Sequence, residues 1–235
     1  MKFAGFPKAG LDFFKRLRKH NDREWFDVHK EEYLQHCRAP MEELVGHLNQ
    51  AFGKFAPEHI TEPKKAVYRI YRDTRFGHDK TPYKTHIAAN FPRKGLEKHS
   101  AAGFYCSVSD EEIEIGGGLY MPGAAELAAL RAFIFEHHAE LKKIVCNKKL
   151  VELMGPFQGE TLQRVPRGYP DDTPARDFLR MKQWVFFQSV DPAIATTADL
   201  LPFLIARCKA VAPLVTFLNT PLLSLSRERT AEGMF

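Results

Sequence analysis

The stretch GFYCSVSDEEIEIGGGLYM, residues 103–121, decides the fold class of this chain. Apolar side chains recur at every second position in both halves of the stretch, which is typical of strands. These positions are Phe104, Cys106 and Val108 in the first half and Ile113 and Ile115 in the second. The polar run at residues 109–111 between the halves indicates a turn. The stretch therefore predicts a β-hairpin.

Helical periodicity dominates both ends of the chain. Apolar residues recur three or four positions apart in three terminal segments. They are Leu11, Phe14 and Leu17, then Met41, Leu44, Val45, Leu48 and Phe52, and near the C-terminus Leu200, Leu204, Val211, Leu214, Val215 and Leu218. A further helix is predicted around residues 127–144, and further strands at 67–76, 86–93 and 184–190. Helices around hairpin-linked strands predict an α+β fold, with a central antiparallel or mixed sheet flanked by N-terminal and C-terminal helices. We expect one domain over residues 1–235.

Composition narrows the class of protein. The net charge of +5 and a pI near 9.0 favour anionic partners. The most apolar region, residues 200–218, is interrupted by charges and prolines, so we expect no membrane span. The N-terminus lacks the apolar run of a secretory signal. The four cysteines are far apart and include no C-x-x-C pair, which predicts reduced thiols in a cytoplasmic protein.

Positive charge is concentrated in YRIYRDTRFGHDKTPYK, residues 68–84. Five cations face only two anions in this stretch, so pairing within the segment cannot neutralise it. The cations are Arg69, Arg72, Arg75, Lys80 and Lys84, and the anions are Asp73 and Asp79. Four aromatic residues, Tyr68, Tyr71, Phe76 and Tyr83, indicate that the segment packs against other residues. The stretch therefore predicts an anion-binding site, with a solvated salt-bridge lattice as the alternative.

Strand geometry gives this site a predicted arrangement. On a strand, Arg69, Asp73 and Arg75 share one face, because side chains alternate. A carboxylate between two arginines fixes their planar forks for bidentate capture of phosphate or carboxylate. We expect these three residues on one concave, partly buried surface. The predicted ligand-binding residues are Arg69, Arg72, Asp73, Arg75, Lys80 and Tyr83, and the candidate proton-transfer residues are Asp79, Tyr83 and His78, with His86 as a further candidate.

These residues also carry a resemblance. The run matches the signature R-x-x-R-D-x-R-F-x-x-x-D-K-x-x-Y and resembles the bacterial and fungal family called domain of unknown function 2461. Its members are Arg69, Arg72, Asp73, Arg75, Phe76, Asp79, Lys80 and Tyr83. Residues 6–30, 116–122 and 164–182 are also similar to that family, so the resemblance covers nearly the whole chain. It implies a shared site at the signature and no particular reaction.

Other motifs carry less functional information. The glycines at 116–118 lack the spacing of a P-loop or of a dinucleotide-binding fingerprint. Three glycines at the end of a strand predict a bulge or a close backbone approach, with amides that face a ligand as the alternative. The histidines form no metal-binding motif, so we expect neither a metal nor a cofactor.

Three functional hypotheses follow. The leading one is a cytoplasmic protein with one cleft that binds an anionic group of a phosphorylated or carboxylated small molecule. It is an enzyme if Asp79 or Tyr83 transfers a proton. The alternative is a nucleic-acid-binding module, in which the same cations neutralise phosphates and Tyr71 or Phe76 stacks on bases. In the third hypothesis the charged motif is a structural salt-bridge brace.

Overall fold

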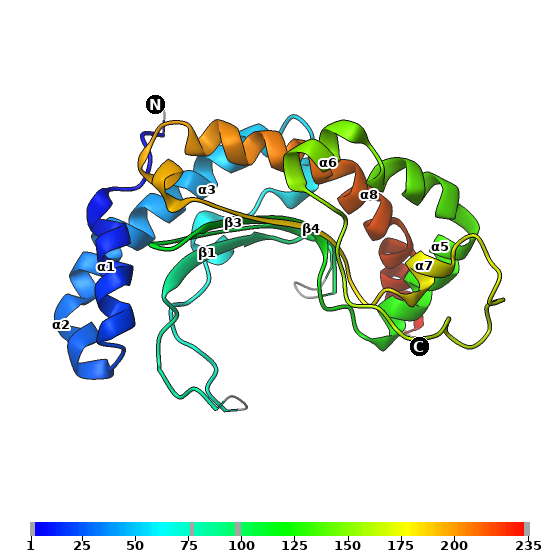
Figure 1. Cartoon of the computed structure of the whole chain (residues 1–235), viewed down its shortest axis with the longest axis horizontal. Coiled ribbons are helices and arrows are strands. Elements are labelled where there is room, and N and C mark those ends of the chain that lie inside the picture. Colours follow the sequence, from blue (N-terminus) through cyan, green and yellow to red (C-terminus); the bar gives the residue numbers. More distant parts are fainter. Residues whose placement is uncertain (1–2, 76–77, 97–99, 233–235) are drawn as a thin grey trace. The chain divides into compact units, whose positions relative to one another are not determined.

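Four strands form one antiparallel sheet in the order β1-β2-β3-β4, so each strand pairs with its neighbour in sequence (Figure 1). The strands are β1 (His86–Phe91), β2 (Gly103–Ser109), β3 (Ile113–Leu119) and β4 (Trp184–Val190). The structure is a computed structural model that describes residues 3–75, 78–96 and 100–232. Helices precede and follow the strands in the chain. The predicted α+β fold is therefore confirmed, and its sheet is antiparallel.

The turn between β2 and β3 is held by Ser109. Its backbone N–H donates to the Glu112 carbonyl oxygen at 3.0 Å, and its hydroxyl donates to the same oxygen at 2.9 Å. The hydroxyl oxygen also accepts from the backbone N–H of Glu111 and of Glu112. A serine that bonds the backbone two and three residues further on stabilises a tight turn. The hairpin predicted at residues 103–121 is confirmed.

The chain divides into two compact units, each made of three segments. Unit 1 comprises Met1–Phe91, Tyr105–Ile115 and Ser189–Ile205. Unit 2 comprises Pro92–Phe104, Gly116–Gln188 and Ala206–Phe235. The expectation of one domain over residues 1–235 stays a prediction.

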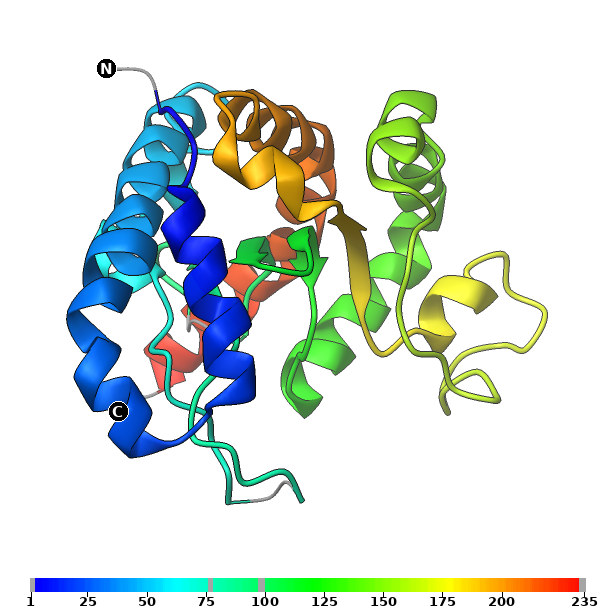
Figure 2. The same ribbon diagram turned by 60° about the vertical axis from the view of Figure 1, so that its left-hand side comes forward.

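Unit 1 contains the N-terminal helices. They are α1 (Lys8–Lys19), α2 (Arg23–Tyr33), the π-helix η1 (Leu34–Arg38), α3 (Ala39–Phe52), the 3-10 helix η2 (Pro57–His59) and α4 (Pro63–Ala66), and the 3-10 helix η3 (Pro192–Thr196) follows β4. The Asp22 side chain accepts from the Trp25 backbone N–H at 2.8 Å and so caps α2. Helices α1 and α2 lie against each other (Figure 2). The helices predicted at this end of the chain are confirmed.

The core of unit 1 lies between α3 and β1. The rings of Phe52 on α3 and Phe91 on β1 meet edge to face, with 4.9 Å between their centroids. Ile87 and Ala89 of β1 are buried like Phe91, as the period of two requires. The alternate positions of β1, beginning with His86, face the opposite side, where Ala88 is also buried. We call that side of the sheet in unit 1 the open face, because no helix of unit 1 covers it among the described residues (Figure 1).

Unit 2 contains the later helices. They are α5 (Ala124–Val145), α6 (Lys148–Met154), α7 (Arg176–Arg180) and most of α8 (Leu200–Glu232), whose first residues belong to unit 1. The predicted helix around residues 127–144 is confirmed as α5. The C-terminal helical pieces prove to be one helix, α8, which contains Pro213 and Pro221.

The glycines at 116–118 permit close backbone approaches within unit 2. A Cβ atom on Gly117 would lie 2.4 Å from the Val211 side chain of α8. On Gly118 it would lie 2.1 Å from the carbonyl oxygen of Trp184 on β4, and Gly118 also has φ +131°. Residues with a side chain rarely adopt this backbone φ. A Cβ atom also cannot lie so close to a carbonyl oxygen. The structural interpretation of this motif is confirmed.

Helix α8 is also the one described helix whose length and composition would allow it to cross a membrane, over Leu200–Arg229. The buried core helix of a soluble protein passes the same test, and many of the apolar residues of α8 are buried. Arg207 and Lys209 interrupt its apolar sequence. This similarity in composition is weak evidence for a membrane span.

Candidate functional site

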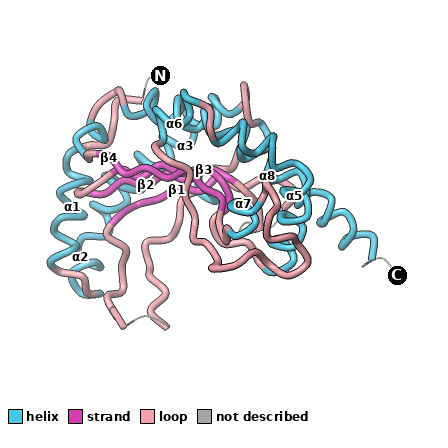
Figure 3. The backbone as a smooth tube through the Cα atoms, turned by 45° about the vertical axis from the view of Figure 1, so that its right-hand side comes forward, coloured by secondary structure: helices cyan, strands magenta, loops and turns pink. Residues whose placement is uncertain are grey.

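The basic stretch forms a loop with two facing arms, which we call the basic hairpin (residues 67–85). Both arms extend away from the sheet as loop (Figures 1 and 3). The Arg72 backbone N–H donates to the Pro82 carbonyl oxygen at 2.9 Å, and that of Lys84 donates to Ile70 at 2.8 Å. Residues 76–77, which include the predicted stacking residue Phe76, lie outside the described part of the chain.

The predicted strand over residues 67–76 is wrong. In the described part of this stretch, residues 67–75, only isolated antiparallel bridges form, between Val67 and Ala89 and between Tyr71 and Tyr83. Pro82 has no N–H to donate, and five like charges repel one another along the arms. A continuous ladder is therefore unfavourable in this stretch.

Tyr83 anchors the hairpin to the N-terminal helices of unit 1. Its backbone N–H donates to Asn21 Oδ1 at 3.0 Å, and its carbonyl oxygen accepts from Asn21 Nδ2 at 3.0 Å. Its ring stacks on Phe26 with 4.1 Å between centroids and is also near Tyr71. Tyr83 is only 3% exposed, and burial raises its pKa, so the phenol stays protonated at neutral pH. The structure gives Tyr83 a packing role, while its assignment to ligand binding and proton transfer stays a prediction.

Asp73 forms a bidentate ion pair with Arg75. Arg75 Nε donates to Asp73 Oδ1 at 3.0 Å, and Nη2 donates to Oδ2 at 2.8 Å. These hydrogen bonds lower the pKa of Asp73 to about 2, with a smaller contribution from the charge of Arg69. The pair is exposed, with 75% of the Arg75 side chain and 44% of the Asp73 side chain accessible. Such a pair orients a guanidinium group without burying it.

Asp79 holds Arg72 in a second pair, across the hairpin. Arg72 Nη1 donates to Asp79 Oδ2 and to the Thr81 hydroxyl. The other carboxylate oxygen of Asp79 accepts from the Thr81 backbone N–H at 2.9 Å and from its hydroxyl at 2.8 Å. The hydrogen bond from Arg72 is the largest cause that lowers the pKa of Asp79 to about 2. Asp79, predicted as a candidate proton-transfer residue, is an ionised partner of an arginine.

The remaining charged residues of the hairpin have different surroundings. Lys80 Nζ donates to the Thr74 carbonyl oxygen at 2.8 Å, and Lys84 Nζ lies 5.1 Å from the centre of the Tyr68 ring. Arg69 is exposed, and its side chain makes no hydrogen bond to another described residue. His78 is exposed at the far end of the hairpin.

The predicted concave surface is not formed as expected. Arg69, Asp73 and Arg75 are all exposed, so the expectation that they are partly buried is wrong. Asp73 bonds Arg75, whereas Arg69 influences it only through charge. Tyr71 and Tyr83 pack against Phe26 at the base of the hairpin, and this packing does not bury Arg69, Asp73 or Arg75.

The two aspartates give a direct test of this arrangement. We expect the carboxyl groups of Asp73 and Asp79 to titrate with midpoints near pH 2, below their usual 3.8. Because the folded-state pKa is depressed, any stabilisation from these pairs is present above the unfolded pKa and is lost as the pH falls toward 2. NMR titration of the side-chain carboxyl carbons measures both midpoints.

Each arginine provides the control for the other. Arg72→Gln should raise the midpoint of Asp79 toward 3.8 and leave Asp73 near 2, and Arg75→Gln should do the reverse. Equal shifts of both aspartates in either variant would contradict the pairing.

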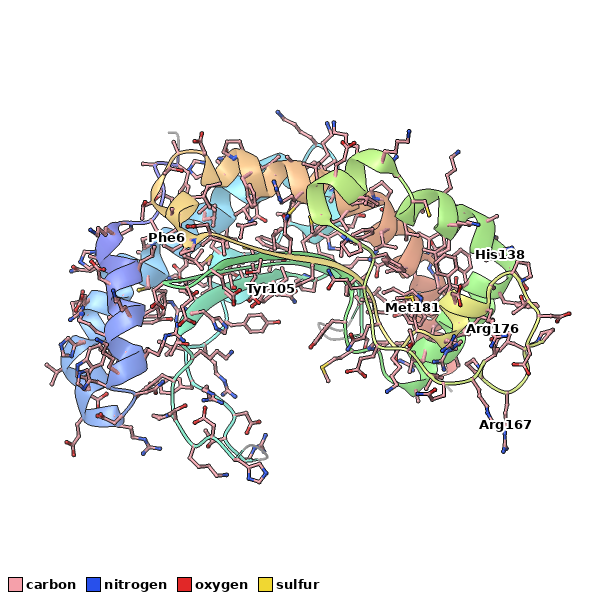
Figure 4. The ribbon with its side chains drawn as sticks, viewed as in Figure 1. Phe6, Tyr105, His138, Arg167, Arg176 and Met181 are labelled. Atoms are coloured by element: carbon pink, nitrogen blue, oxygen red, sulfur yellow. The ribbon has the colours of Figure 1, made fainter. Side chains whose placement is uncertain are left out.

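A second polar cluster lies on the open face of unit 1. We call it the sheet patch, and it consists of His86 on β1, Tyr105 and Ser107 on β2, and Glu114 on β3. Ser107 Oγ donates to Glu114 Oε2 at 2.7 Å, and the Tyr105 hydroxyl donates to the same oxygen at 3.4 Å. Figure 4 shows Tyr105 beneath the sheet, on the side opposite α3. Burial raises the pKa of Tyr105.

His86 is partly buried on the sheet, where the charge of Glu114 acts on its imidazole. Burial lowers its pKa from the usual 6.5, and the charge of Glu114 is the largest opposing influence. The imidazole is therefore mainly neutral at neutral pH. Of the two histidines predicted as acid-base candidates, His86 is half-buried on the sheet and His78 is exposed.

The sequence contained only part of the signal for this patch. Tyr105 and Ser107 are the polar members of an alternating strand, which predicts that they face away from the core. That alternation does not reveal which residues of the neighbouring strands lie beside them. Among the described residues, no group of three or more His, Cys, Asp or Glu side chains is placed to hold a metal ion.

Comparison with known proteins shows the family. The family model described as "Conserved hypothetical protein (DUF2461)" matches residues 9–217. No curated protein and no solved structure matches the chain. The matched range contains the whole basic hairpin and the sheet patch. The chain thus belongs to the family called domain of unknown function 2461.

Proposed function

We propose that unit 1 binds an anionic ligand through the basic hairpin. The observation that carries this proposal is the state of Arg72. Its Nη1 is fixed by Asp79 and Thr81, whereas its Nε and Nη2 donate to no other described residue. These two N–H groups form the edge of a guanidinium group that binds a phosphate or carboxylate through two parallel hydrogen bonds. Arg72 is thus held in place with a binding edge open.

The charge of the hairpin supports the same function. Residues 68–84 contain five cations and two anions, which gives a net charge of +3. Both anions already bind arginines, so neither offsets the charge of Arg69 or Lys80 by direct pairing. An uncompensated positive field attracts anions from solution. A phosphorylated or carboxylated small molecule is the ligand class that we propose first.

Binding is better supported than catalysis. Asp79 is ionised and hydrogen-bonded to Arg72, and the pKa of buried Tyr83 is raised. Neither group therefore has a pKa near neutral pH, as an acid-base catalyst needs. The brace hypothesis is also less well supported, because a stabilising brace requires buried cations. Exposed ion pairs contribute little to the stability of a fold.

One observation favours nucleic acid as a second candidate ligand. Tyr71 lies on the hairpin beside Arg72, and half of its surface (50%) is exposed. It contacts Phe26 and Tyr83, with ring centroids 6.5 Å and 5.4 Å away, so its position is fixed. A fixed, exposed ring beside cations can stack on a base of a single strand.

Salt dependence of binding separates the two ligands. We expect pyrophosphate to bind with a shallow dependence on salt, because one small anion replaces few counterions. A single-stranded dT oligonucleotide that contacted all five cations would show a slope of log K against log salt of about −3.5. Calorimetric titrations with both probes between about 50 and 200 mM salt give the slopes. If neither probe binds at low salt, the proposed function is wrong.

A further inference from the structure

The sheet patch has a feature that the hairpin does not explain. Both hydrogen bonds to Glu114 reach the same oxygen, Oε2, from neutral hydroxyl groups at 2.7 Å and 3.4 Å. Oε1 accepts no hydrogen bond from any described residue, although the side chain is partly buried. A carboxylate with one oxygen held by hydroxyl groups and the other without a partner among the described residues can bind a cation or a further donor.

No cation of the described part of unit 1 fills that role. The charged groups that act on His86 are Glu114 on β3, Glu112 just before β3, Lys84 before β1, and Arg18 on α1. Arg18 already binds two other carboxylates, Asp110 at 2.8 Å and Glu111 at 3.1 Å. Lys84 lies over the Tyr68 ring. Arg18 is therefore engaged by two carboxylates of the turn between β2 and β3.

We propose that the sheet patch binds the ammonium group of a ligand, with Glu114 Oε1 as its principal acceptor. The face of the Tyr105 ring offers a second attraction for a cation. The His86 side chain makes no hydrogen bond to another described residue. The unprotonated nitrogen of its neutral imidazole is a further acceptor for the ammonium group. Ser107 is a positioning residue, since its buried hydroxyl fixes the carboxylate through Oε2.

The chemistry of the patch favours an ammonium group over other donors. A hydroxyl group would satisfy a lone pair of Glu114 but leave its charge uncompensated. A metal ion requires several ligands, and the patch supplies one carboxylate and one imidazole from β3 and β1. An ammonium ion needs only acceptors and an aromatic face, both of which the patch contains.

A ligand that carries both an amine and an anionic group would suit the chemistry of the patch and of the basic hairpin. This combined statement rests on the proposed function, whereas ammonium binding at the patch does not. The two sites can therefore be tested separately, each with its own probe.

The test uses n-butylammonium and, as the uncharged match of the same chain length, n-butanol. Two-dimensional NMR follows the His86 and Tyr105 side-chain signals during each titration. We expect saturable shifts with n-butylammonium and none with n-butanol. Glu114→Gln keeps the size and the Ser107 contact but removes the charge, so affinity should fall about tenfold or more. Equal shifts with both probes, or unchanged affinity in Glu114→Gln, would overturn the proposal.

Two further variants guard against effects on folding. Glu24→Gln removes an exposed carboxylate of α2 in the same unit and should leave binding unchanged. Tyr105→Leu removes the aromatic face and should weaken binding even if Glu114→Gln proves unstable. Normal binding by a folded Tyr105→Leu protein would count against the patch.

The pH dependence has a defined sign. Protonated His86 would repel an ammonium group, so affinity should fall as the pH drops below the lowered pKa of His86, and His86→Asn should reduce that fall. Failure of this proposal is distinguishable from failure of the proposed function. Glu114→Gln should bind pyrophosphate normally, and Arg72→Lys should bind n-butylammonium normally.

Discussion

Replacing Gly118 with alanine is expected to destabilise the protein by about 3–5 kcal/mol. The φ of Gly118, +131°, costs a residue with a side chain about 1–3 kcal/mol. The added Cβ atom would also lie 2.1 Å from the Trp184 carbonyl oxygen, so β3 and β4 would have to move apart. In a chain of this length the melting temperature should drop by roughly 10 °C, which calorimetry measures.

Gly155 provides the matched control. It too lies in unit 2 and has a positive φ of +76°, but a Cβ atom placed on it would meet nothing within 4 Å. Gly155→Ala therefore carries the conformational cost without the clash, about 1–3 kcal/mol. The difference between the two variants measures the contribution of close strand approach. Equal losses would show that the contact with Trp184 relaxes freely.

Replacing Arg72 with lysine is expected to weaken pyrophosphate binding about tenfold or more. Lysine keeps the positive charge but has no Nε and Nη2 pair of donors, so the two parallel hydrogen bonds cannot form. The melting temperature should change little, because the pair with Asp79 is exposed and such pairs contribute little to stability. Calorimetric titration with pyrophosphate and thermal melts measure the two effects.

Arg38 is the matched control for this substitution. Its side chain is 35% exposed, compared with 33% for Arg72, and it also binds one carboxylate, that of Glu42 at 2.8 Å. Arg38 lies outside the hairpin, so Arg38→Lys should bind pyrophosphate as the original protein does. An Arg72→Lys protein that melted several degrees lower and bound pyrophosphate normally would support the brace hypothesis instead.

Local patterns predicted the strands whose order in the sheet follows the sequence. The apolar alternation is complete in β2 and covers Ile113 and Ile115 at the start of β3, and Ser109 supplies the turn, so this hairpin depends on little else. The same rule failed for residues 67–76, because charge repulsion and Pro82 oppose a ladder there. Strand propensity does not account for repulsion between charged side chains. In residues 67–76 this repulsion opposes a continuous strand.

The candidate site was predictable in composition but not in pairing. The excess of cations in residues 68–84 is visible in the sequence. That Arg72 pairs with Asp79 across the hairpin, and not with its neighbour Asp73, depends on how the two arms face each other. The contacts of Glu114 depend likewise on the register of β2 against β3. A one-residue slip in that register would turn Ser107 or Glu114 to the other face.

The division into two units has a consequence for the way in which this chain can be cut. The backbone passes from one unit to the other after residues 91, 104, 115 and 188, within or beside the strands, and after residue 205, within α8. No single cleavage point separates the units, and no continuous gene fragment encodes either unit without part of the other. Strands β2, β3 and β4 each begin in one unit and end in the other. A fragment that contains all of one unit therefore also contains part of the other.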